Sequence, residues 1–138
     1  MTPSLLHPRE CSDRTLPKLL ASSDGPVVVA SHFGGWEWKA LGDEAWTELE
    51  TALGKRVRGV EIETGENREF ATRHGLEIVP AVLVFLGGVV VARLSGRVRA
   101  SQVIEAVRRA EAESRSFAAA VEELELAVER AERPSPLR

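Results

Sequence analysis

The sequence contains very little cysteine. A single residue, Cys11, occurs among 138 residues, and a lone thiol cannot form a disulfide within its own chain. No group of cysteines and histidines has the spacing of a zinc site. We therefore expect no internal disulfide, no metal site and no cofactor, and we expect a reducing, cytoplasmic setting.

The chain also lacks a basic excess, an export segment and a long apolar run. Its 18 Lys and Arg residues against 21 Asp and Glu residues give a net charge of -3, which leaves no cationic surplus for a phosphate backbone. The first residues contain no charged segment followed by an apolar stretch of signal-peptide length. The longest mostly apolar run, 78–92, is interrupted by Pro80 and Gly87-Gly88 and is shorter than the roughly 20 residues that span a bilayer. We expect neither nucleic acid nor a membrane as a partner.

Helical and strand patterns alternate along the chain. A row of small or β-branched apolar residues at 27–31 is typical of a strand covered on both faces. Gly87 and Gly88 join two apolar runs, which indicates a hairpin because both central residues of such a turn need positive φ. In chain order we expect a helix at 16–21, a strand at 27–31, a helix at 36–53, a strand at 57–63, a helix at 66–74, strands at 79–86 and 89–94, and a helix capped by Ser101. This order predicts an α/β fold whose mixed four-stranded sheet has helices on both faces.

A further helix follows, because apolar residues continue at alternating spacings of four and three. The repeating residues are Phe117, Val121, Leu124, Val128 and Ala131. Such a heptad stripe is typical of a helix that buries a narrow face. It either folds back onto its own domain, which is the simpler interpretation, or pairs with a second copy or a partner helix. We expect a flexible N-terminus at 1–11, one domain at 12–112, this amphipathic helix at 113–132 and a disordered tail at 133–138.

Several of these segments resemble the thioredoxin fold, across roughly residues 16–110. The matching segments are Gly25–Val29 before the first core strand, Glu66–Leu76, Ile78–Phe85, the Gly87-Gly88 turn and Gly96 before the last helix. The resemblance implies a thioredoxin-like domain with one extra C-terminal helix. It also implies a cis peptide bond between Val79 and Pro80.

The sequence departs from that family where the family carries its chemistry. Thioredoxin-like redox proteins have a Cys-x-x-Cys at the start of the helix after the first core strand, where the helix N-terminus stabilises a thiolate. This chain has Trp36-Glu37-Trp38-Lys39 there, and Ala30 occupies the position of the family's buried carboxylate. No side chain in that tetrapeptide can exchange a disulfide. The family's dithiol mechanism is therefore excluded on chemical grounds.

The two tryptophans of this tetrapeptide point in different directions on a helical wheel. Trp38 lies near the centre of the stripe through Leu41, Ala45, Leu49 and Ala52, and Trp46 falls on its flank. Trp36 lies about 160° from Trp38 on the same wheel, so a helix that includes Trp36 presents this ring to solvent or a partner. In the alternative, Trp36 belongs to the preceding loop and folds over Phe33.

These observations favour a redox-inactive thioredoxin-like protein that acts by binding, as an assembly, maturation or chaperone-like accessory factor. In the family, the loop at the cis proline contacts extended peptides, so Val79 is expected to pair with a partner segment in β fashion. The expected binding residues are Trp36, Glu37, Lys39, Val79 and Pro80. Residues 81–88 also resemble thioredoxin-like accessory proteins of nickel-iron hydrogenase maturation, which likewise lack the cysteine pair.

The alternative class is an enzyme without dithiol chemistry. His32 ends the first core strand, where sites are usually built, and could act with Glu37 or Lys39 in acid-base work. A second variant is a single-cysteine peroxidase that uses Cys11. The simpler interpretations are an inert Cys11, a structural, hydrogen-bonded His32, and surface positions for His7 and His74. We therefore assign no catalytic residue.

Overall fold

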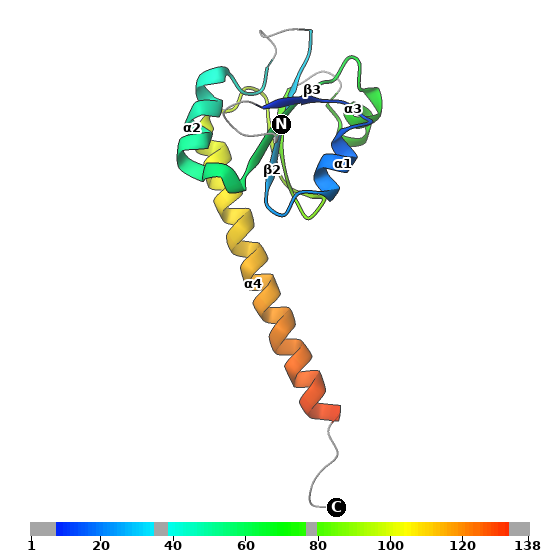
Figure 1. Ribbon diagram of the computed structural model, residues 1–138, viewed down its shortest axis with the longest axis vertical. Coiled ribbons are helices and arrows are strands. Elements are labelled where there is room, and N and C mark those ends of the chain that lie inside the picture. The colour runs from blue at the N-terminus through cyan, green and yellow to red at the C-terminus, as the bar shows by residue number, and fades with distance from the viewer. Residues whose placement is uncertain (1–7, 35–38, 77–79, 133–138) are drawn as a thin grey trace, which may run out of the picture.

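A computed structural model describes residues 8–34, 39–76 and 80–132 of the chain. Figure 1 shows an α/β domain from which one long helix projects. In chain order the elements are β1 (Arg9–Cys11), α1 (Leu16–Ala21), β2 (Val27–His32), α2 (Asp43–Leu53), a 3-10 turn (Gly54–Arg56), β3 (Arg58–Glu63), α3 (Arg68–His74), β4 (Ala81–Leu86), β5 (Val89–Ser95) and α4 (Ala100–Glu132).

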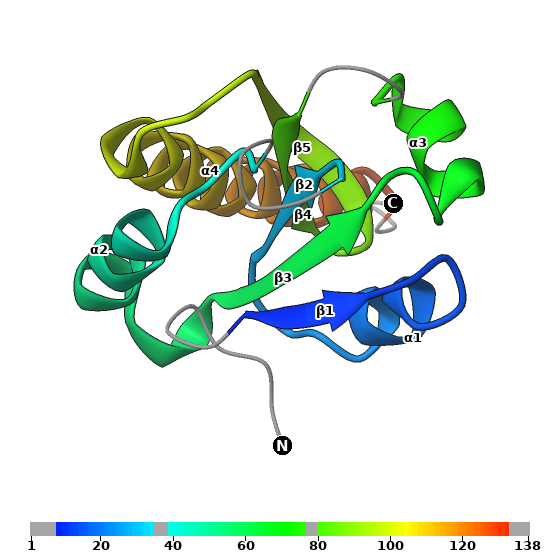
Figure 2. The same cartoon turned by 90° about the horizontal axis from the view of Figure 1, so that it is seen from above.

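The described strands form one mixed sheet in the order β1-β3-β2-β4-β5. The first three strands run parallel to one another, and β4 and β5 are antiparallel to their neighbours. Figure 2 shows the sheet between two layers of helices. Helices α2 and α4 pack on one face around Trp46 and Val103, and α1 and α3 pack on the other around Leu16 and Phe70. This arrangement confirms the predicted fold class.

Within the described residues the sheet has five strands rather than the four that we predicted. The additional strand, β1, lies inside the segment that we expected to be a flexible N-terminus, and it pairs in parallel with β3 through residues 60–62. A strand of three residues shows too little alternation for sequence patterns to detect it. Residues 1–7 and the tail at 133–138, for which we also predicted disorder, lie outside the described residues.

The helix that we predicted from residue 36 begins later, at Asp43. Gly42 precedes it with extended backbone angles, φ -81° and ψ 170°. Lys39 forms an antiparallel bridge with His32, and the N–H of Ala40 donates to the carbonyl of Ser31 at 3.0 Å. Residues 39–40 therefore add to the edge of β2 where we expected a helical turn. Trp46, which we placed on the flank, is a core residue with 1% of its surface exposed.

The hairpin prediction is confirmed, because Gly87 and Gly88 join β4 to β5 with φ values of 62° and 80°. Helices α2 and α3 end at the predicted residues 53 and 74, where Gly54 and Gly75 follow as C-caps. The predicted N-cap, Ser101, is wrong, since it lies inside α4, and the N–H of Arg99 before the helix donates to Oε1 of Gln102.

The C-terminal segment is continuous with the last helix of the domain. Helix α4 runs for 33 residues with no break at the expected boundary after residue 112. Val103 and Val107 are fully buried, whereas Phe117 is 72% exposed and Leu124 is 64% exposed. The expectation that this segment folds back onto its own domain is wrong, because its distal half extends away from the sheet (Figure 1).

Candidate functional site

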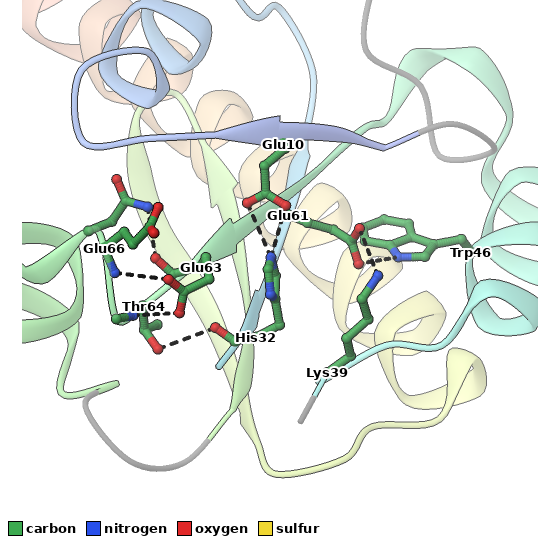
Figure 3. A network of polar contacts seen from close by, with 10 residues as sticks. Glu10, His32, Lys39, Trp46, Glu61, Glu63, Thr64 and Glu66 are labelled. Atoms are coloured by element: carbon green, nitrogen blue, oxygen red, sulfur yellow. Dashed lines mark hydrogen bonds and ion pairs between the residues drawn. The ribbon is translucent and has the colours of Figure 1, made fainter. Parts of the chain in front are cut away.

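Polar side chains gather at the carboxyl end of the three parallel strands, which is where α/β proteins usually build their sites. Glu10 of β1 lies opposite Glu61 of β3, which in turn lies opposite Ala30 of β2. Partners in register present their side chains to the same face of a sheet. Figure 3 shows the resulting network, in which Glu10, Glu61 and His32 point to the face that α2 and α4 cover.

His32 is held by a carboxylate that we did not predict. Its Nε2 lies 2.9 Å and 3.1 Å from the two carboxylate oxygens of Glu10, and its backbone carbonyl accepts a 2.9 Å hydrogen bond from the N–H of Thr64. The ring is 13% exposed, while the Glu10 side chain is 55% exposed. Nδ1 is buried and has no hydrogen-bond partner among the described residues. Glu10 therefore orients the ring, and the partner that we expected, Glu37, lies outside the described residues.

Glu61 accepts the second set of hydrogen bonds in this network. Its carboxylate accepts hydrogen bonds from Nζ of Lys39 and from the indole N–H of Trp46, both at 3.4 Å. The Glu61 side chain is 13% exposed, and that of Lys39 is 25% exposed. A carboxylate thus lies one strand away from Ala30, at the same level of the sheet. The contact turns the Lys39 ammonium toward Glu61 and away from the surface on which we had placed it.

Ser31 joins the two backbone segments that we expected to form the binding site. Its hydroxyl accepts a hydrogen bond from the N–H of Ala81 at 2.8 Å and donates one to the carbonyl of Ala81 at 3.2 Å. Its backbone carbonyl binds the N–H of Ala40. Ser31 is 1% exposed. It therefore holds the Lys39 end of one segment and the Pro80 end of the other against the tip of β2.

The structure describes two of the five expected binding residues. Lys39 and Pro80 lie on either side of Ser31, and both are partly buried. Trp36, Glu37 and Val79 lie outside the described residues, as do Trp38 and the peptide bond between Val79 and Pro80. The predictions for those residues, including the cis bond, stay predictions.

Sequence patterns missed Glu10, Ser31 and Glu61 as members of this site. Glu61 carried a usable signal: it lies between the inward-facing Val60 and Ile62, so it must point to the opposite face. That face is also covered by helices, so a carboxylate there needs partners. Glu10 and Ser31 gave no comparable signal, because their roles depend on strands that are distant in the sequence.

Cys11 lies in the core on the other face of the sheet, under α1 with Leu16 and Leu19. It is 4% exposed. Burial raises the pKa of its thiol, and the hydrogen bond to Thr15 and the charge of Arg9 oppose this shift only in part. A nucleophilic thiol needs to be deprotonated and accessible. The Cys11 thiol therefore lacks both properties that a peroxidase requires.

His74, for which we predicted a surface position, is partly buried between two aromatic rings. Its ring centroid lies 4.6 Å from that of Phe70 and 5.8 Å from that of Phe85. Desolvation lowers the pKa of His74, and the neighbouring charges of Arg73 and Arg93 lower it further. The ring lines an open groove of about 750 Å³ between α1, α3 and the β4–β5 hairpin. His7 lies outside the described residues.

The described residues also bear on metal binding and membrane crossing. In 8–34, 39–76 and 80–132, no three His, Cys, Asp or Glu side chains come close enough together to hold a metal ion. No helix of these segments combines the length and apolar character needed to cross a bilayer.

Several solved structures superpose on this chain and identify its fold. A single-substitution mutant of thioredoxin from Halobacterium salinarum NRC-1 superposes with a TM-score of 0.57 at 18% identity, over 79% of this chain and 95% of that chain. Thioredoxin f2 of Chlamydomonas reinhardtii superposes with a TM-score of 0.60 at 17% identity, over 74% of this chain and 94% of that chain.

A third similar chain comes from a structure that describes thiol resolution in yeast mitochondrial 1-Cys peroxiredoxin by the glutathione and thioredoxin systems. It superposes with a TM-score of 0.61 at 13% identity, over 77% of this chain and 98% of that chain. No protein-family model and no curated protein sequence matches the chain. At these identities the structural similarity shows that the chain has a thioredoxin-like fold.

Proposed function

We propose that this chain is a redox-inactive thioredoxin-like protein that works by binding another protein, as an accessory factor for assembly, maturation or folding in a reducing cytoplasm. One observation carries the proposal. The only cysteine of the sequence is buried beneath α1, on the opposite face of the sheet from the polar network around His32 and Glu61. At the position of the family's thiols the sequence has Trp36-Glu37-Trp38-Lys39. Because no thiol is available for exchange chemistry, the protein acts by binding a partner through its surface.

The proposed partner is an extended segment of another protein, which lies along Val79 and Pro80 and contacts Trp36 and Glu37. The geometry of the described residues supports this choice. The antiparallel ladder between β2 and β4 ends at the pair Ala30 and Val82. Beyond it, Ser31 takes over the hydrogen bonds of Ala81, so the backbone at Pro80 parts from β2, while the Pro80 carbonyl still accepts a hydrogen bond from the N–H of Gly96 after β5. An edge of this kind can accept a strand from a partner.

Affinity capture from the native host tests the proposal directly. The wild-type chain is expected to retain a partner that Trp36→Ala loses. Leu126→Ala serves as the control, because Leu126 is a 45% exposed apolar residue on the distal half of α4 and is not part of the proposed site. The same partners in all three preparations would remove Trp36 as the anchor. Appreciable turnover in an insulin-reduction or peroxide-consumption assay would contradict the binding role itself.

A narrower form of the proposal is a role in nickel-iron hydrogenase maturation, and it rests on the resemblance of residues 81–88 to accessory proteins of that process. It predicts that the captured partner is a hydrogenase subunit precursor. A gene for such a client beside the gene for this chain would support it, and capture of an unrelated client through Trp36 would contradict it.

A second candidate function, acid-base catalysis without thiols, is favoured by the contact between His32 and Glu10. A carboxylate that orients an imidazole is a common arrangement in general acid-base catalysis. Any activity found in a substrate screen would then be lost in His32→Gln and reduced in Glu10→Gln, with unchanged activity in His74→Gln as the control. Activity that persists in His32→Gln would exclude this candidate.

A further inference from the structure

The apolar stripe of α4 continues from the core of the domain into solvent without a change of register. Alternating steps of four and three residues connect all of its positions. The buried part consists of Val103, Val107 and Ala110, and the projecting part, which we call the α4 seam, consists of Ser114, Phe117, Val121, Leu124, Val128 and Ala131. One uninterrupted heptad pattern therefore has a first half whose side chains are buried in the protein's own core and a second half whose side chains have no cover.

The uncovered half is too apolar to be an ordinary solvent-exposed helix. Phe117, Leu124 and Val128 are 72%, 64% and 48% exposed. The alanines that flank the seam at residues 118, 120 and 127 are small enough to let a second helix approach closely. From Ser114 to Ala131 the seam is about 26 Å long, which is enough for several layers of contacts.

The charge of the projecting half differs from that of its base. Residues 113–132 carry six glutamates and two arginines. Where α4 leaves the domain, a groove of about 500 Å³ is lined by four basic residues, Lys55, Arg56, Arg58 and Arg115, and by two acidic ones, Asp24 and Glu111. Arg56 binds Glu111 through two hydrogen bonds of 2.9 Å and 3.0 Å. The helix thus has an acidic tip, and it leaves the domain beside a groove whose lining is mainly basic.

We propose that the α4 seam pairs with the seam of a second copy of this chain, with the two helices antiparallel. This orientation brings the tip of each copy, which carries Glu129 and Glu132, to the level of the mainly basic groove where α4 of the other copy leaves its domain. A parallel pair would instead bring the glutamates of both tips together, and like charges in contact are destabilising.

The volumes of the side chains in the seam also fit this pairing. With Val121 of one copy opposite Leu124 of the other, Phe117 lies opposite Val128 and Ser114 lies opposite Ala131. Each large residue therefore meets one of medium size, and the two small residues meet at the ends. A two-fold axis relates all of these contacts, as in an isologous dimer. A second copy therefore supplies both the apolar surface and the basic charges that this helix requires.

The oligomeric state of the full chain tests the proposal by sedimentation equilibrium at increasing concentration. We expect the wild type to form dimers and Leu124→Glu to remain a monomer at the same concentrations. Leu126→Glu is the matched control, because Leu126 is 45% exposed and lies on the opposite face of α4 from the seam; it is expected to dimerise as the wild type does. A monomeric wild type, or equal dimerisation of both variants, would overturn the proposal.

Disulfide trapping tests the orientation. Ser114→Cys and Ala131→Cys are prepared as separate chains and then mixed under mild oxidation. An antiparallel pair joins the two different chains in the mixture, and neither chain alone forms a covalent dimer. Covalent dimers of each chain alone would show a parallel pair and overturn the proposed orientation. A seam that binds only a different protein would overturn the second copy as its occupant. Both tests are independent of Trp36, so their failure would leave the proposed function in place.

Discussion

The hydroxyl of Ser31 satisfies both backbone groups of Ala81, accepting from the N–H at 2.8 Å and donating to the carbonyl at 3.2 Å. These two residues lie 50 positions apart and meet at the point where β2 and β4 separate. Ser31 is 1% exposed and Ala81 is fully buried. One side chain therefore satisfies the backbone where the β2–β4 ladder ends, close to Lys39 and Pro80 of the proposed binding site.

Removing this hydroxyl is expected to destabilise the fold. Ser31→Ala leaves the buried N–H and carbonyl of Ala81 without this partner, which costs about 1–3 kcal/mol in the free energy of unfolding. Ser22→Ala is the control, because Ser22 is exposed and its hydroxyl donates only to the carbonyl of Leu19; a change within about 0.5 kcal/mol is expected there. Urea unfolding measures both, and equal effects would contradict the role of Ser31.

Cys11 is expected to be unreactive in the folded protein. Its thiol is buried, and burial raises its pKa, so both access and the thiolate form are disfavoured. Labelling with a chromogenic disulfide reagent should be at least about 100-fold slower in the native state than in denaturant. The denatured chain supplies the control rate. Native labelling at that rate would show an accessible thiol and revive the peroxidase alternative.

The pKa of His74 predicts a loss of stability on mild acidification. Because the folded state lowers this pKa below the ordinary value of 6.5, the unfolded chain binds the proton first as the pH falls. His74 therefore makes its full contribution to the free energy of unfolding above pH 6.5, and this contribution decreases progressively below that pH. His74→Phe keeps an aromatic ring against Phe70 and Phe85 and cannot be protonated.

Urea unfolding of the wild type and His74→Phe from neutral to mildly acidic pH measures the effect. The difference between their free energies of unfolding is expected to be constant above neutral pH and to shift in favour of the variant below pH 6.5. Glu111 titrates in a lower window: the hydrogen bond from Arg56 lowers its pKa below 4.5, so its contribution is lost only under more acidic conditions. A constant difference between the two proteins down to pH 5 would refute the assignment to His74.

Gly25 is expected to tolerate no side chain. A Cβ atom at this position would lie 2.5 Å from the backbone oxygen of Arg56, and backbone cannot move aside cheaply. Gly25→Ser should therefore destabilise the fold by about 1–3 kcal/mol. The same change at Gly42 meets no atom within 4 Å and supplies an N-cap hydroxyl to α2, so Gly42→Ser should stabilise by a few tenths of a kcal/mol. Thermal unfolding compares them; similar losses at both sites would contradict the steric explanation.

Local patterns in the sequence predicted most of the secondary structure because they report short-range physics. The apolar run at 27–31, the two hairpin glycines and the helix ends at Gly54 and Gly75 all correspond to elements of the fold. Local patterns did not predict the residue at which α2 begins. Leu41 is buried at the expected spacing, but its neighbour Ala40 forms backbone hydrogen bonds with Ser31 across the preceding loop and with Val98, which is distant in the sequence. The helical wheel anchored on residues 38–41 therefore misplaced Trp46.

The candidate site was predicted only in part, for a related reason. His32 was identified because it ends a core strand, and its hydrogen-bonded role was expected. Its partner, Glu10, belongs to a strand of three residues that pairs with β3, and no local pattern indicates that pairing. Glu61 became recognisable as a buried carboxylate only once both faces of the sheet were known to be covered. Long-range strand pairing decided each of these contacts.

By itself, the sequence determined the class of fold, the order of most elements and the lack of a cysteine pair, because periodicity, turn residues and residue type act locally. Tertiary structure alone decided which carboxylates hold His32 and Lys39, where the single thiol is buried, and that α4 continues past the domain as one helix. These outcomes depend on which distant segments pack together, since packing determines which face of each element is desolvated and which remains uncovered.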